Sequence, residues 1–203
     1  MQDSILKFSN EELAVLSDRN FFQLKHSSTA KLVEIFGRLE IELKKIFLAS
    51  GIQVKDLNTS SGKIFRGENY RGFPYVLLDC PRLFTRESVF AFRTMFWWGN
   101  EFTFTLHIQG EALEKIKPAM FRNLEKLKGQ GILFCINKSP WQYHLGDDNY
   151  ISLDEDDNLS VAKEIVKQKE FVKISRKLSV EQYERVLKTG EETLKLFLSA
   201  LKD

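Results

Sequence analysis

The sequence is poor in the residues that build metal sites and disulfide frameworks. Its 203 residues include two cysteines and three histidines. Cys80 and Cys135 are too few for the disulfide network of a small secreted domain, and they do not form a Cys-x-x-Cys pair. Each lies in an apolar, strand-like run, so we interpret both as small buried hydrophobes. The histidines at positions 26, 107 and 144 are dispersed, and we expect no metal and no cofactor.

Long hydrophobic runs are also missing. No apolar stretch approaches the ~20 residues that a membrane-spanning helix requires. The segment Met1–Lys7 lacks the basic start and apolar stretch of a signal peptide. We therefore expect a cytoplasmic protein that does not enter a membrane.

An excess of charge of one sign is absent as well. Lysine and arginine total 30 and aspartate and glutamate 28, which gives a formal net charge of +2. Proteins that bind nucleic acids usually gather a basic excess on one face, because neutralising phosphates supplies much of their affinity. The sequence shows no such excess, so we do not expect a nucleic-acid partner.

Motifs of known catalytic sites are not found either. The sequence has no Gly-x-Ser-x-Gly elbow, no P-loop and no His-Glu-x-x-His. The acidic stretch 147–157 lacks the alternating ligands and the closing glutamate of an EF-hand. A cysteine–histidine pair assembled only by the fold stays open, because the spacing of these residues does not decide it.

Aromatic residues are abundant, with 17 phenylalanines, five tyrosines and three tryptophans. Each aromatic side chain can bury ~150–250 Å², and a chain of this length buries roughly 70% of its unfolded surface. Proline, at four residues, is too scarce to mark a linker. We predict one globular domain over residues 1–203.

Two helices are predicted at the start of the chain. Ser9 and Glu12 have the spacing of a capping box, which predicts a short helix to about Ser17. A second helix should run to Ser50 and end at Gly51. Its apolar residues alternate steps of four and three, which we interpret as a face packed on a sheet rather than a coiled-coil seam. These residues are Leu32, Phe36, Leu39, Leu43 and Ile46.

The remainder alternates between strands and helices. The expected strands are 63–66, 73–80 (ended by Pro81), 87–99, 101–109, 132–137, 141–145, 150–153 and 171–175. The expected helices are 112–128, with Pro118 in the first turn of its main segment, 159–168, and a last one opened by a capping box at Ser179. Consecutive hairpins predict the α+β class: a largely antiparallel sheet with the N-terminal and C-terminal helices packed on one face or end.

One hairpin carries the most informative pattern. Residues 102–109 alternate apolar and polar without a break, but the preceding strand is apolar on both sides. A two-residue loop would bury Arg93 among the phenylalanines, whereas a three-residue loop would place Arg93 opposite Thr105. Burying an unpaired guanidinium costs roughly 5 kcal/mol or more, so we predict the three-residue loop.

That register gathers a mixed polar and aromatic face. It would contain Arg93, Trp97, Thr103, Thr105 and His107, with Arg66 and Arg71 of the loop 66–72 at its rim. Our leading hypothesis is a non-enzymatic binding module that holds an anionic small molecule or peptide on this face. In the competing interpretation a helix such as the last one covers the face, Arg93 pairs with a carboxylate, and 66–72 is a plain surface loop.

Two other functions stay open. An enzyme acting on an anionic or phosphorylated substrate would use His107 as acid and base, oriented by Asp79, with Arg93 as the clamp. A structural or subunit-interface protein would instead bury its aromatic face against a second copy. We expect a monomer or a homodimer.

Overall fold

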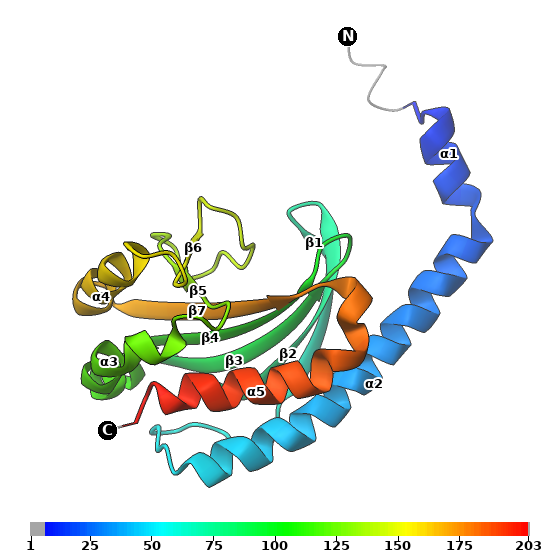
Figure 1. Ribbon diagram of the computed structural model, residues 1–203. Helices are drawn as coiled ribbons and strands as arrows, with labels where there is room; N and C mark the ends of the chain where they lie inside the picture. Colours follow the sequence, from blue (N-terminus) through cyan, green and yellow to red (C-terminus); the bar gives the residue numbers. More distant parts are fainter. Residues whose placement is uncertain (1–6, 203) are drawn as a thin grey trace.

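A single antiparallel sheet organises the chain (Figure 1). The computed structural model describes residues 7–202. Its seven strands follow the order β1-β2-β3-β4-β7-β5-β6. The strands are β1 Lys63–Tyr70, β2 Phe73–Phe84, β3 Ser88–Trp97, β4 Phe102–Gly110, β5 Leu133–Cys135, β6 Tyr150–Ser152 and β7 Phe171–Leu178. The first four form consecutive hairpins, so the predicted α+β class is confirmed.

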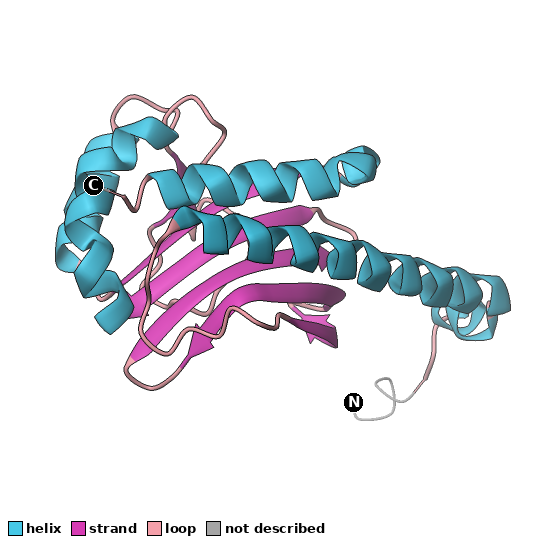
Figure 2. Cartoon of the chain, turned by 90° about the horizontal axis from the view of Figure 1, so that it is seen from below, coloured by secondary structure: helices cyan, strands magenta, loops and turns pink. Residues whose placement is uncertain are grey.

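Helices cover one face and one end of this sheet. They are α1 Asn10–Ser17, α2 Arg19–Ser50, α3 Glu111–Asn123, α4 Asn158–Gln168 and α5 Val186–Ser199, with short 3-10 helices at Leu124–Leu127 and Val180–Arg185. Helices α2 and α5 lie side by side across the same face of the sheet (Figures 1 and 2). The first turns of α2 continue beyond the sheet and carry α1 away from the rest of the chain (Figure 1).

The N-terminal helices begin and end as their caps dictate. The Ser9 hydroxyl accepts from the amide of Glu12, and the Glu12 carboxylate accepts from the amide of Ser9, which confirms the capping box. The Asp18 carboxylate accepts from the amide of Phe21 and opens α2. At the other end Gly51 has a φ of 72°, a left-handed conformation that glycine adopts without strain.

The main core lies between α2, α5 and the apolar face of the sheet. The predicted stripe of α2 is buried at Leu32, Phe36, Leu39 and Leu43, but Ile46 is only partly buried. Phe47 completes the stripe instead, its ring 5.7 Å from that of Phe90. The phenylalanine face of the sheet is therefore buried by the chain's own helices.

Two prolines lie inside elements that we expected them to bound. Strand β2 does not end at Pro81 but runs to Phe84. Its pairing with β3 shifts between Asp79 and Arg82, and an irregular ladder of this kind tolerates a residue without an N–H. Pro118 lies in the interior of α3 rather than in a first turn. It is exposed, so the carbonyl that it leaves without a donor lies on the solvent side of the helix.

Two further predictions, both in the C-terminal part of the chain, were wrong. Residues 141–145 form no strand; they belong to a loop, and β6 pairs with β5 instead. The alternation of large side chains there reflects packing of Tyr143 on the sheet rather than a ladder. The last helix also starts late, because a 3-10 helix follows Ser179, whose side chain makes no capping hydrogen bond, and α5 begins only at Val186.

Candidate functional site

The β3–β4 hairpin has the predicted three-residue loop. Phe96 pairs with Phe102, and the amide of Trp97 donates to the carbonyl of Glu101 at 3.1 Å. In this register Arg93 lies opposite Thr105. We call the resulting surface the polar face; it consists of Arg93, Trp97, Thr103, Thr105 and His107, the residues that the sequence predicted to share one side of the sheet.

Arg93 is paired within the polar face. Its Nε lies 2.7 Å from Oδ1 of Asp79, and its Nη2 lies 2.8 Å from Oδ2. The Arg93 side chain is 16% exposed and that of Asp79 is 2% exposed. Burial, the largest single effect, would lower the pKa of Arg93, but the hydrogen bonds with Asp79 and the charge interactions with Tyr143, Asp79 and Tyr75 together outweigh it and raise that pKa. The pairing is the one expected of a covered face.

A loop, and not a helix, provides the cover. Residues 136–149, which connect β5 to β6 and which we call the covering loop, lie on the side of the sheet opposite α5 (Figure 1). The ring of Tyr143 lies 4.4 Å from the guanidinium carbon of Arg93 and 4.4 Å from the Nζ of Lys173. A tyrosine of the covering loop therefore lies within cation–π distance of two cations.

Lys173 of β7 is fully buried beneath this loop. Its Nζ donates to the carbonyl of Pro140 at 2.9 Å and to the carbonyl of Gln142. Among residues 7–202 no carboxylate lies within ion-pair distance of it. Burial, with a smaller effect of Arg93, lowers the pKa of Lys173 to about 8. The sequence analysis missed this residue, although its place between Val172 and Ile174 marks a charge in an alternating strand.

His107 is also buried, and it faces the covering loop. Its Nδ1 lies 3.3 Å from the hydroxyl of Tyr143, and its ring lies 5.4 Å from that of Trp141. Burial lowers the pKa of His107 to about 3, helped by the charge of Lys173. His107 is thus neutral at physiological pH. The His107 ring hydrogen-bonds to Tyr143 and not to Asp79, because both carboxylate oxygens of Asp79 bind Arg93. Asp79 therefore does not orient His107 as the enzyme hypothesis requires.

The two threonines and the tryptophan are packed into the same layer. Thr105 shares a hydrogen bond of 2.8 Å with Ser175, and the indole N–H of Trp97 donates to the carbonyl of Tyr70. The Thr103 hydroxyl is buried and has no hydrogen-bond partner within residues 7–202. The polar face is therefore a second, smaller core in the structure.

The two predicted rim arginines lie apart from each other. Arg71, in the turn after β1, is close enough to the covering loop that its charge helps His144 to lower the pKa of Asp148. Arg66 lies opposite Val76, a residue of the main core on the helix side of the sheet. It lines a cavity with Phe22. Arg71 is thus beside the polar face, and Arg66 is on the other side.

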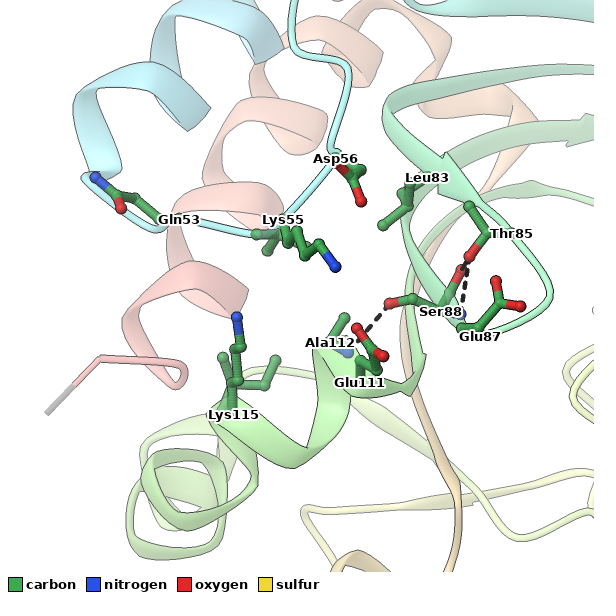
Figure 3. A pocket seen from close by; sticks show the side chains of 12 residues that line it. Gln53, Lys55, Asp56, Leu83, Thr85, Glu87, Ser88, Glu111, Ala112 and Lys115 are labelled. Carbon is green, nitrogen blue, oxygen red and sulfur yellow. Dashed lines mark hydrogen bonds between the residues drawn. The ribbon is translucent and has the colours of Figure 1, made fainter.

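A separate cavity opens where α3 begins (Figure 3). It measures about 230 Å³, and Lys55 and Lys115 approach it from one side. Carboxylates of Asp56, Glu87 and Glu111 also line it. The charges are close to balance, and no side chain in it is both buried and unpaired within the described residues. The cavity therefore gives no preference for a ligand of either sign.

The remaining feature is the projecting N-terminal segment. We call residues 8–31 the arm; it comprises α1 and the part of α2 before Leu32, the first buried residue of that helix. Helix α1 buries none of its residues. Large apolar side chains of the arm are between 45% and 64% exposed; they are Phe8, Leu13, Val15, Leu16, Phe21, Phe22 and Leu24. This is the largest group of exposed apolar residues along the described chain.

Comparisons with known proteins add no assignment: no family model, no curated protein and no solved structure matches this chain. Within residues 7–202, no group of three or more histidines, cysteines or carboxylates is placed to hold a metal ion. Over the same residues, no helix is both long enough and apolar enough to cross a bilayer.

Proposed function

We propose that this chain is a cytoplasmic, non-enzymatic binding module that engages another protein through its arm. The observation that carries the proposal is the exposure of seven large apolar side chains on a segment that projects from the sheet. Exposed apolar patches mark interaction sites in soluble proteins, and these seven side chains all lie between positions 8 and 24 of one projecting segment.

The length of α1 supports the same conclusion. It has eight residues and none is buried, whereas isolated helices shorter than ~12–15 residues are marginal in water. Its capping box contributes about 1 kcal/mol, which is less than the entropy cost of ordering two helical turns. A partner that buries Leu13 and Leu16 would supply the missing stabilisation.

A photo-crosslinking amino acid in place of Leu16 tests this proposal in cells. Leu48 is the matched control, because it is 63% exposed on the body of α2 and lies outside the arm. A discrete crosslinked protein from position 16, and none from position 48, is the expected result. Equal or absent crosslinking at the two positions would refute a role for the arm.

A second candidate, an anionic ligand on the polar face, has one observation in its favour. Arg93 and Lys173 carry two positive charges there against the single negative charge of Asp79, and Lys173 is bonded only to backbone of the covering loop. Displacing that loop would leave a cation without partners. Native mass spectrometry of protein purified from cells tests it: an added mass that Lys173→Met removes would support the site, and the bare chain mass would eliminate it.

A further inference from the structure

We infer that the protein bound by the arm is a second copy of this chain, with the two arms antiparallel about a two-fold axis near Asp18. The inference rests on the proposed function and names its partner. Three properties of the arm carry it: the distribution of charge, the positions of the apolar residues, and a cavity at its base.

Charge is divided sharply along the arm. The outer part, Ser9–Asp18, contains three acidic residues and no lysine or arginine. The inner part, residues 19–31, contains three lysines or arginines and no acidic residue. In an antiparallel pair the acidic part of each arm lies along the basic part of the other, so the pairing is attractive twice. A parallel pair would place like charges together.

The apolar residues fit the same alignment. An axis between Asp18 and Arg19 brings Leu13 beside Leu24 of the partner subunit and Leu16 beside Phe21 of the partner subunit. Glu12 then meets Lys25 of the partner subunit; within each chain Lys25 also pairs with Glu68, 2.6 Å away. In each helix the three participating residues are spaced by one, three and four positions, which places them on one helical face.

A cavity lies where the outer end of the partner's arm would reach. It measures about 270 Å³ and lies between the arm and the end of the sheet, with Phe22, His26, Thr29 and Trp98 in its lining. The antiparallel alignment brings Phe8 of the partner subunit to Thr29. Phe8 is 64% exposed within its own chain, so a large apolar side chain and a partly apolar cavity meet in the pair.

The apolar area of the arm supplies part of what a dimer interface needs. Five apolar residues take part in the alignment and are each about half exposed: Phe8, Leu13, Leu16, Phe21 and Leu24; an aromatic side chain presents ~150–250 Å². Together they offer several hundred Å², against ~800 Å² per partner in a standard interface. The chain's own α1 does not supply this contact, because Asp18 alone separates the two helices and helix pairs need connections of about two residues or more.

Sedimentation velocity of the full chain, and of variants that change charge in each part of the arm, tests the inference. The wild type should sediment as a dimer of the 23.7 kDa chain. The outer variant is Glu11→Lys with Glu12→Gln, which keeps a side chain able to complete the capping box. The inner variant is Arg19→Glu with Lys25→Gln, which changes the two basic residues that the alignment places opposite Asp18 and Glu12 of the partner subunit. Each should raise the dimer dissociation constant about tenfold or more, since every change occurs twice in a two-fold interface.

Mixing the two variants gives the specific readout. A mixed pair contains one unaltered acidic-to-basic contact, whereas each homodimer of a variant contains none. The heterodimer should therefore be more abundant in the mixture than either homodimer. The control variant, Glu191→Lys with Glu192→Lys on α5, should remain as dimeric as the wild type. A monomeric wild type, or a mixture no more associated than its components, overturns the inference.

The crosslink at position 16 separates this inference from the proposed function. An adduct of twice the chain mass supports both. An adduct with a different protein overturns the second-copy inference and leaves the binding role of the arm in place. Without any adduct, both fail.

Discussion

The Nζ of Lys173 lies 2.9 Å from the carbonyl oxygen of Pro140, so a buried strand lysine holds the backbone of the covering loop. Lys169, near the start of the same strand, does the same: its Nζ lies 2.7 Å from the carbonyl of Ile136 and 2.6 Å from that of Asn137. Two lysines from one segment therefore fix both the beginning and the middle of the loop over the polar face.

Lys173 should make the protein more stable as pH rises above neutrality. Its pKa is about 8 in the folded chain against an ordinary 10.5. Between these values the unfolded chain binds a proton that the folded chain has released, so the free energy of unfolding increases with pH, by up to ~1.4 kcal/mol per pH unit. Urea denaturation from pH 7 to 10 measures this increase.

The variant Lys173→Met should lack that increase, whereas Lys177→Met, an exposed lysine of the same strand, should keep it. Equal pH profiles for the two variants would show that Lys173 is not the group responsible.

His107 should make the fold sensitive to acid. Its pKa is about 3 in the folded chain and 6.5 ordinarily. As pH falls through this interval the unfolded chain takes up a proton that the folded chain excludes, so stability is lost below about pH 6.5. We expect His107→Gln to flatten the acid side of the stability profile. Urea denaturation between pH 4 and 7 measures this acid limb; an equally steep limb in the variant would contradict the prediction.

Arg93 and Asp79 should behave as a unit. Removing one partner of a buried ion pair leaves the other charge buried and unpaired, which typically costs ~3–5 kcal/mol of folding free energy. We expect Arg93→Met to destabilise by about this amount, and the double variant with Asp79→Leu to recover most of the loss. A double-mutant cycle by chemical denaturation measures the coupling; additive losses would mean that the two side chains act independently.

Gly110 should tolerate no side chain. Its φ is 63°, and a Cβ there would lie 2.0 Å from the carbonyl oxygen of Glu87. Gly110→Ala combines the strain of a backbone conformation that essentially only glycine adopts (φ 63°, ψ −139°), on the order of 1–3 kcal/mol, with a backbone clash, so it should displace the start of α3 and lower the melting temperature markedly. Gly129 has a φ of 75° and open space around it. Gly129→Ala therefore reports the strain alone and should have the smaller effect.

Local signals were sufficient for much of the fold. Capping residues defined the start of α1 and the end of α2, and the cost of burying Arg93 was enough to choose the register of β3 and β4. These features depend on neighbours in sequence or on one hairpin. The predictions made from Pro81 and Pro118 were wrong. An irregular strand pairing accommodates Pro81 and the solvent-facing side of α3 accommodates Pro118, and neither feature can be recognised from the pattern of residue types.

The environment of the polar face depends on contacts distant in sequence. Lys173 reaches it only because β7 pairs with β4, and Tyr143 reaches it through a loop whose alternation resembles a strand. The arm was missed for another reason. Its apolar residues suggested two ordinary packed helices, and only the structure shows that α2 continues beyond the sheet before its first buried residue.

The hydroxyl of Tyr70 accepts hydrogen bonds from the amides of Tyr143 and His144, at 2.6 and 3.0 Å. Tyr70 belongs to β1, at one margin of the sheet, and the covering loop joins β5 to β6, at the opposite margin. Hydrogen bonds across this face of the sheet therefore connect its two edges directly. Detaching either edge strand must first break the hydrogen bonds of Tyr70, so the two edges of the sheet should unfold together.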